Sequence, residues 1–312
     1  MKKSTQYFLV GVFTVLFIAA FGCFIWYNAN KLVLRTNEPA LQTSLIEERI
    51  PRGTEKENVV YCNNQKLDFY APTDGSSKKV SLVIFVHGGG WRMNNKDSDQ
   101  EVRGLFEGLR GRGYALASID YSLTPQYQYP KPQQDVLCAV RFMRANAVRF
   151  AIDADKIALA GFSAGANLAA LAGTNSDLST FGNGLYTTTS STVQAVVGIG
   201  GVYDFGGTLH PNSVGNIKNL MQNNNPLIGS PTTYISSKAA PMLLLYGTKD
   251  SVVYPVQSTN YAKLLTKNGV ENSVVLVQNA EHDLSAAGGA ISPSRDQIVS
   301  IIKDFIDKTL GR

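Results

Sequence analysis

Lys156-Ile157-Ala158-Leu159-Ala160-Gly161-Phe162-Ser163-Ala164-Gly165-Ala166-Asn167-Leu168-Ala169-Ala170 begins as an apolar run, passes through a Gly-Phe-Ser-Ala-Gly motif and continues as an Ala- and Leu-rich helical pattern. The pattern predicts a strand, a sharp turn and a helix, with Ser163 at the apex. Gly161 and Gly165 flank the serine where a strained turn brings backbone too close for a Cβ atom. This arrangement is typical of a nucleophilic serine. An ordinary strand-turn-helix connection rich in small residues is the alternative.

Composition narrows the class of protein. The chain has 312 residues, 44% hydrophobic and 17% charged, which suits one large α/β domain or two small ones. The net charge of +5 comes from scattered basic residues, so we expect no nucleic-acid partner. The three cysteines, Cys23, Cys62 and Cys138, are too few for a disulfide framework. A Cys62–Cys138 bridge is possible, but nothing in the sequence indicates one. With only three histidines, we expect no metal site.

The N-terminal segment has the pattern of a membrane anchor. Residues 7–27 form a run of 21 residues without charge or proline, long enough to span a hydrocarbon core of about 30 Å. Lys2 and Lys3 precede it and favour a cytoplasmic N-terminus. We therefore expect residues 1–30 to be an uncleaved signal anchor, a single-pass transmembrane helix with the rest of the chain outside the cytoplasm. Secretion after signal-peptide cleavage and a buried core helix are the alternatives.

Residues 31–57 are polar and predict a linker, followed by one domain over residues 58–312. Residues 58–62 and 66–70 predict a β-hairpin. The domain then alternates apolar runs with helical patterns, which predicts a mostly parallel sheet with helices on both faces. The expected strands are 81–86, 114–119, 156–160, 193–199, 241–246 and 273–277, and the expected helices are 98–112, 133–149, 164–173, 256–268 and 294–309. Residues 174–192 predict a surface loop, and 203–240 either a small cap or a long crossover.

A serine nucleophile needs a base, and the base needs an orienting acid. In an open α/β sheet these groups lie on loops just past the carboxyl ends of strands. Asp250 and His282 each follow an apolar run by a few residues, so we assign them as acid and base. Asp250 as a helix N-cap and His282 as a surface histidine are the alternatives. Glu281 and Asp283 also flank the histidine, but sequence neighbours rarely orient an imidazole.

The stretch His87-Gly88-Gly89-Gly90-Trp91 follows the apolar run 81–86. Three consecutive glycines leave backbone N–H groups unshielded. We expect Gly88, Gly89 and Ala164 to form an oxyanion hole, in which N–H groups stabilise the negative oxygen of a tetrahedral intermediate. His87 is expected to brace this loop. No Lys-Ser/Thr pair follows the glycines, which excludes a P-loop.

Four motifs together resemble the α/β-hydrolase fold of the hormone-sensitive-lipase-like carboxylesterases and the related feruloyl- and acetyl-xylan-esterase-like group. They are His-Gly-Gly-Gly-Trp at 87–91, Asp-Tyr-Ser-Leu-Thr-Pro at 120–125, Gly-Phe-Ser-Ala-Gly at 161–165, and the order serine, aspartate, histidine. The resemblance covers roughly residues 58–310 and implies carboxylic ester hydrolysis without a cofactor. Phe162 replaces the aspartate usual in hormone-sensitive-lipase-like elbows, which favours the feruloyl/acetyl branch. Trp91, Phe162, Tyr121 and Tyr254 are candidates for the substrate pocket, with core or loop packing as the alternative.

The sequence therefore predicts a serine carboxylesterase acting on short acyl, acetyl or feruloyl esters through an acyl-enzyme. Its expected partners are small-molecule or carbohydrate-linked esters and, through the N-terminal helix, a membrane. A serine peptidase on the same fold, or a non-catalytic membrane-anchored binding protein, are the alternatives. The oligomeric state is not predicted.

Overall fold

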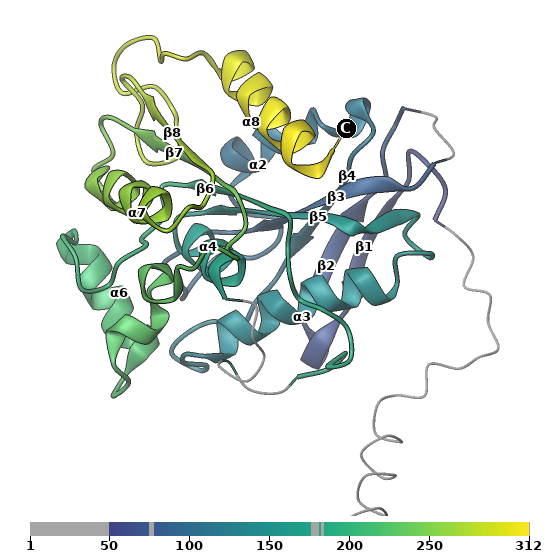
Figure 1. Ribbon diagram of the computed structural model, residues 1–312, viewed down its shortest axis with the longest axis horizontal. Helices are drawn as coiled ribbons and strands as arrows, with labels where there is room; N and C mark the ends of the chain where they lie inside the picture. The colour runs from purple at the N-terminus through teal and green to yellow at the C-terminus, as the bar shows by residue number, and fades with distance from the viewer. Residues whose placement is uncertain (1–49, 75–77, 176–180, 182–183, 312) are drawn as a thin grey trace, which may run out of the picture. The chain divides into compact units, whose positions relative to one another are not determined.

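The computed structural model describes residues 50–74, 78–175, 181 and 184–311. Within them, one eight-stranded sheet has the order β1-β2-β4-β3-β5-β6-β7-β8 (Figure 1). The strands are β1 Glu55–Val60, β2 Lys66–Tyr70, β3 Val80–Val86, β4 Ala115–Ile119, β5 Ile152–Phe162, β6 Ala195–Ile199, β7 Met242–Gly247 and β8 Asn272–Val277. The pairs β1–β2 and β2–β4 are antiparallel, and every other pair is parallel. The predicted α/β-hydrolase architecture is confirmed.

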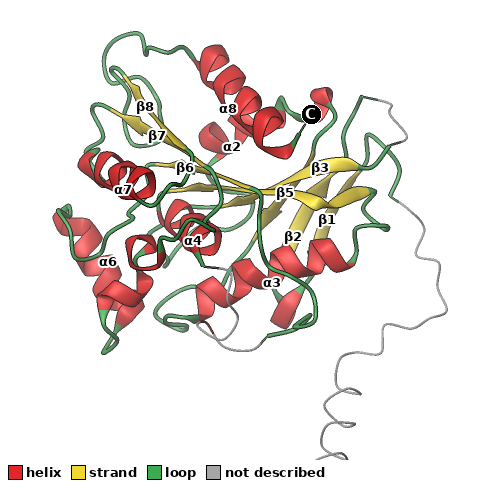
Figure 2. Cartoon of the chain, viewed as in Figure 1, coloured by secondary structure: helices red, strands yellow, loops and turns green. Residues whose placement is uncertain are grey.

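Helices cover both faces of the sheet, as the continuous apolar runs require. Figure 2 shows α3, α4 and α7 on one side, and α2 and α8 on the other. Their bounds are α2 Gln100–Glu107, α3 Lys131–Ala145, α4 Ala164–Thr174, α7 Val256–Lys267 and α8 Arg295–Leu310. Side chains of β3 alternate between two cores: Leu82, Ile84 and Val86 pack in one. Val83 and Phe85 pack in the other. This period of two places β3 between two helical layers.

Two predicted boundaries need correction. β1 begins at Glu55, inside the segment predicted as a linker over residues 31–57. The helix predicted over 98–112 is broken: α2 ends at Glu107, and a short 3-10 helix, η2, spans Arg110–Arg112. Gly108 is the C-cap residue of α2, and η2 in turn ends at Gly113, whose φ of 81° favours glycine.

The segment 203–240, which the sequence leaves as either a cap or a crossover, contains α6 Pro211–Met221 and two short 3-10 helices, η3 Pro226–Gly229 and η4 Pro231–Tyr234. The imidazole of His210 caps α6 by accepting the N–H of Asn212. One face of α6 is buried and the other is exposed: Ile217 and Leu220 are buried, whereas Val214 is 51% exposed. It is a helix packed on the domain by one face.

A disulfide joins Cys62 to Cys138, with the two Cα atoms 6.1 Å apart. Cys62 lies in η1 Cys62–Asn64, directly after β1, and Cys138 lies in α3. The bridge therefore ties the antiparallel edge of the sheet to the helix beside it. The sequence left this pairing open.

In the part of the chain that the structure describes, no helix is both long enough and apolar enough to span a membrane. The predicted anchor over residues 7–27 lies outside the described residues.

Candidate active site

Ser163 occupies the single position between β5 and α4. Its backbone has φ 53° and ψ −115°, a conformation that a non-glycine residue rarely adopts. The N–H of Ser163 donates to the carbonyl of Ile199 at the end of β6 (2.8 Å), which fixes the turn. A Cβ atom at Gly165 would lie 2.1 Å from the carbonyl oxygen of Val86. Glycine at this position is thus required by the close approach of α4 to the end of β3.

Asp250 and His282 come together on the loops that follow β7 and β8. The Nδ1 atom of His282 lies 2.7 Å from Oδ2 of Asp250, whose side chain is fully buried. The other carboxylate oxygen accepts the N–H groups of Val252 and Val253, each at 2.8 Å. Because a carboxylate only accepts, Nδ1 carries the proton, which leaves Nε2 of a neutral imidazole as the acceptor.

Backbone contacts between these two loops bring the pair together. The N–H of Lys249 donates to the carbonyl of Ala280 (2.9 Å). A Cβ atom at Gly247 would lie 2.2 Å from the carbonyl oxygens of both Ala280 and Glu281. Glycine at the end of β7 therefore lets the histidine loop lie directly against it.

A cavity of about 190 Å³ contains the serine and the histidine. Its lining residues are Gly89, Gly90, Trp91, Asn94, Asp99, Phe162, Ser163, Ala164, Val202, Asn212, Ser213, Asn216, Val252, Val253 and His282. Of the predicted site residues, the structure brings together Ser163, His282, Gly89, Ala164, Trp91 and Phe162 along this cavity, with Asp250 behind the histidine.

Gly88 does not fit its predicted role. Its N–H donates to Oδ2 of Asp99 at 2.6 Å, so this donor is already engaged. Gly89 and Gly90 line the cavity instead, both with positive φ. Ala164 begins α4, and the first N–H groups of a helix have no intrahelical acceptor. Gly89, Gly90 and Ala164 all line the cavity, so their N–H groups are the candidates for the role predicted for Gly88.

Tyr121 and Tyr254 do not line the cavity. The Tyr121 side chain is buried, stacks on His87 with ring centroids 4.2 Å apart, and donates to the carbonyls of His87 and Gly88. It supports the glycine loop from behind. Tyr254 is 38% exposed and faces the ring of His210. The sequence shows that each tyrosine lies shortly after a predicted strand. It does not show whether the side chain lines the cavity or packs elsewhere.

His87 is fully buried, and its Nδ1 atom lies 2.8 Å from the Gly88 carbonyl, to which it donates. Burial is the main influence on its pKa and lowers it, against smaller raising effects of the Gly88 hydrogen bond and of Asp99. A neutral imidazole thus braces the glycine loop, as predicted for a supporting residue.

Sequence reasoning missed Asp99 and the α6 residues. Asp99 has φ 57°, and its carboxylate accepts from Gly88 and, at 3.1 Å, from the amide of Asn94. Asn212 and Asn216, one helical turn apart on α6, face the same cavity. Pro211 is a typical first residue of a helix, so the sequence could have indicated α6. Nothing in the sequence indicates that this helix would lie beside the cavity.

A second, more open cavity of about 600 Å³ shares Asp99, Phe162, Val252 and His282 with the first. Phe162 packs against His282, with ring centroids 4.8 Å apart. The histidine therefore lines two cavities, a small one that Ser163 also lines and a wider one that Ser163 does not line.

A strained serine at a strand-to-helix turn and an imidazole held by a buried carboxylate lie on the loops of a sheet with the α/β-hydrolase architecture. The chain matches the BD-FAE family model over residues 67–265 and belongs to that family. It is 29% identical over 228 residues to the esterase LipC of Mycobacterium tuberculosis, covering 69% of this chain and 56% of that protein.

The esterase LipQ of the same organism is also 29% identical, over 257 residues that make up 79% of this chain and 60% of LipQ. The chain thus spans little more than half of the length of these two curated relatives. A solved structure described as a truncated carbohydrate esterase from gut microbiota has a TM-score of 0.72 at 22% identity. That match covers 85% of this chain and all of the other, and shows that they share a fold.

Proposed function

We propose that this protein is a serine carboxylesterase that hydrolyses esters of short acyl groups through an acyl-enzyme. The observation that carries the proposal is the Asp250–His282 pair, 2.7 Å apart, whose histidine lines one cavity with the strained Ser163. Membership of the BD-FAE family and likeness to two esterases support the same reaction.

In the proposed first step, Nε2 of His282 takes the proton of the Ser163 hydroxyl as Oγ bonds to the ester carbonyl carbon. The N–H groups of Gly89, Gly90 and Ala164 stabilise the resulting oxyanion. The bond to the alkoxy oxygen then breaks, and the imidazolium returns its proton to the leaving alcohol. Water repeats the sequence on the acyl-enzyme and releases the acid. Asp250 holds the histidine tautomer and stabilises the cation.

The two cavities suggest how an ester is oriented. The small cavity contains the serine and the oxyanion donors, so it takes the acyl group, and about 190 Å³ lies below the usual range of small-molecule sites. The wider cavity adjoins His282, which must protonate the leaving alcohol, so it takes the alcohol. Acetyl and other short acyl esters of larger alcohols, carbohydrates included, are the expected substrates.

The test is covalent labelling of the full chain with a fluorophosphonate, beside hydrolysis of p-nitrophenyl acetate. We expect one label per chain, absent in Ser163→Ala, and a loss of turnover of at least about 10⁴-fold in that variant. Hydrolysis of peptidyl amides but not of esters would instead indicate a peptidase, and no labelling at all would indicate a non-catalytic binding protein.

We also propose that the domain is held at a membrane by residues 7–27 and faces an oxidising compartment outside the cytoplasm. The uncharged run supports the anchor. The Cys62–Cys138 disulfide supports the compartment, because disulfides are rare in reducing cytosol. Full-length chain should stay with membranes after an alkaline wash, and its release by that wash would contradict the anchor.

A further inference from the structure

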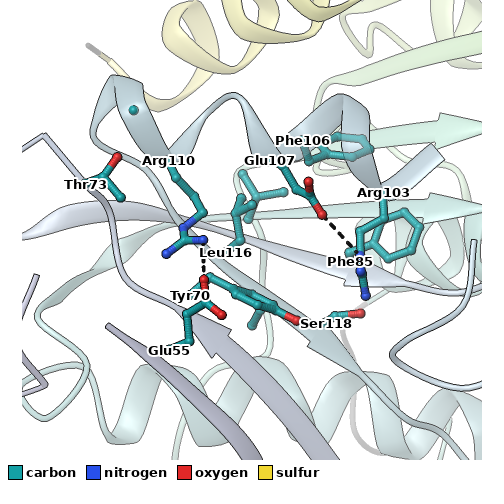
Figure 3. A pocket seen from close by; sticks show the side chains of 13 residues that line it. Glu55, Tyr70, Thr73, Phe85, Arg103, Phe106, Glu107, Arg110, Leu116 and Ser118 are labelled. Atoms are coloured by element: carbon teal, nitrogen blue, oxygen red, sulfur yellow. Dashed lines mark hydrogen bonds and ion pairs between the residues drawn. The ribbon is translucent and has the colours of Figure 1, made fainter. Parts of the chain in front are cut away.

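A cavity of about 500 Å³, larger than the one around Ser163, lies between the sheet and α2 (Figure 3). None of the proposed catalytic residues lines it. Its lining residues are Glu55, Tyr70, Thr73, Val83, Phe85, Arg103, Phe106, Glu107, Arg110, Gly111, Leu116, Ala117 and Ser118. Val83, Phe85, Phe106 and Leu116 give it an apolar floor, whereas two arginines and two glutamates stand around the rim.

Arg103 has fewer partners than a largely buried guanidinium requires. Its side chain is only 16% exposed, and one terminal nitrogen donates to the Lys96 carbonyl at 3.0 Å. The Nε atom is buried and has no hydrogen-bond partner among the described residues. The nearest carboxylate oxygen, on Glu107, lies 3.6 Å from Nε, too far for a hydrogen bond. A buried donor without an acceptor is unfavourable, so this position favours a ligand that supplies one.

Arg110 on the same rim differs, because its Nε and one terminal nitrogen both have an acceptor at hydrogen-bond distance. It donates to Glu55 at 2.7 Å and to the Ala71 carbonyl at 3.2 Å, and its guanidinium lies over the Tyr70 ring. Figure 3 shows Arg110 and Arg103 on either side of that ring. Arg110 therefore forms a wall of the cavity, and Arg103 is left as the cation that can take a ligand.

We propose that this cavity binds a monocarboxylate with an apolar tail, its carboxylate on Arg103 and its tail on the apolar floor. A guanidinium and a carboxylate match in a planar, two-bond geometry. Glu107, whose side chain is 59% exposed, turns to solvent when the ligand arrives, since exposed ion pairs contribute little. The nearby Glu55 stays on Arg110. This site does not depend on the proposed esterase activity, although that reaction would release acids of the same class.

The test uses the full chain carrying Ser163→Ala, with 4-fluorobenzoate as the probe, followed by ¹⁹F NMR titration. We expect saturable binding, weakened about tenfold or more in Arg103→Gln. Arg149→Gln removes the same charge from a residue that does not line the cavity and should bind as the unchanged chain does. The neutral isostere 4-fluorobenzamide should bind at least about tenfold more weakly.

Absence of saturable binding, or equal binding of the acid and the amide, would overturn the proposal. So would unaltered binding by a folded Arg103→Gln variant. If that variant does not fold, Arg103→Lys keeps the charge but loses the two-bond geometry, and the acid-to-amide comparison on the unchanged chain still decides. Because no step of this assay is catalytic, a failure of the esterase proposal would leave its outcome readable.

Discussion

The serine turn and α6 line the same cavity but are built in different ways. The turn is held by backbone: the Ser163 N–H is bonded to β6, and α4 approaches β3 so closely that only glycine fits at position 165. α6 is a half-exposed surface helix that reaches the cavity through the side chains of Asn212, Ser213 and Asn216. The serine turn is thus held mainly by backbone contacts, whereas the cavity wall on α6 is made of side chains that can be exchanged singly.

The largest effect on turnover is expected at Asp250, the acid that pairs with His282. Asp250→Asn should lower the turnover of p-nitrophenyl acetate by about 10⁴-fold, or about 5.5 kcal/mol on the barrier, because an amide favours the wrong imidazole tautomer. Asn can still accept the N–H groups of Val252 and Val253, so the loop should survive. The matched control is Asp283→Asn, beside the histidine in sequence. A loss below tenfold in Asp250→Asn, or a greater loss in the control, would reassign the acid.

The second prediction tests the rigidity of the turn itself. Gly165→Ala should lower the free energy of unfolding by about 3 kcal/mol, since a Cβ atom there would meet backbone and not a movable side chain. Urea unfolding measures the change. At Gly108 a Cβ atom would find its nearest neighbour at 3.8 Å, so Gly108→Ala should stay within about 1 kcal/mol of the unchanged chain. Equal stability of the two variants would show that the turn can yield.

Asp99 combines the two kinds of contact, backbone and side chain, because its side-chain carboxylate accepts a backbone N–H group. It binds the Gly88 N–H, and the peptide units that follow present Gly89 and Gly90 to the cavity. Asp99→Ala should lower turnover roughly 10- to 100-fold, less than the loss of an oxyanion donor itself, with KM little changed. Asp99→Asn keeps an acceptor and should remain within about threefold. A rise in KM at constant turnover would instead make Asp99 a substrate-binding residue.

The sequence predicted the backbone-held region well and the side-chain-built region poorly, for a physical reason. A strand, a turn that requires glycine, and the order of Ser163, Asp250 and His282 are local patterns, and parallel topology brings strand ends to one edge. The predicted strands therefore match the observed ones within a few residues, apart from β5, which begins four residues earlier than expected.

By contrast, Gly88 was assigned as an oxyanion donor because nothing local shows that Asp99, 11 positions later, would engage its N–H. Tyr121 and the α6 asparagines were misjudged or missed for the same reason. Which way a side chain faces depends on packing between segments distant in sequence, and periodicity does not report it.

The smallest effect is expected on α6. The amide of Asn216 lies against Gly90, where a Cβ atom would be 2.5 Å from Nδ2, and Asn216 lines the cavity beside the glycine loop 88–90. Asn216→Ala removes one neutral polar contact and should change kcat/KM for acetate esters by about two- to fivefold. Because the same change widens the acyl side, butyrate esters should lose less than acetate esters or gain. Asn219→Ala, on α6 but outside the lining, is the control for helix propensity. A uniform loss over both acyl lengths, or the same shift in the control, would mean that α6 supports the loop without shaping the cavity.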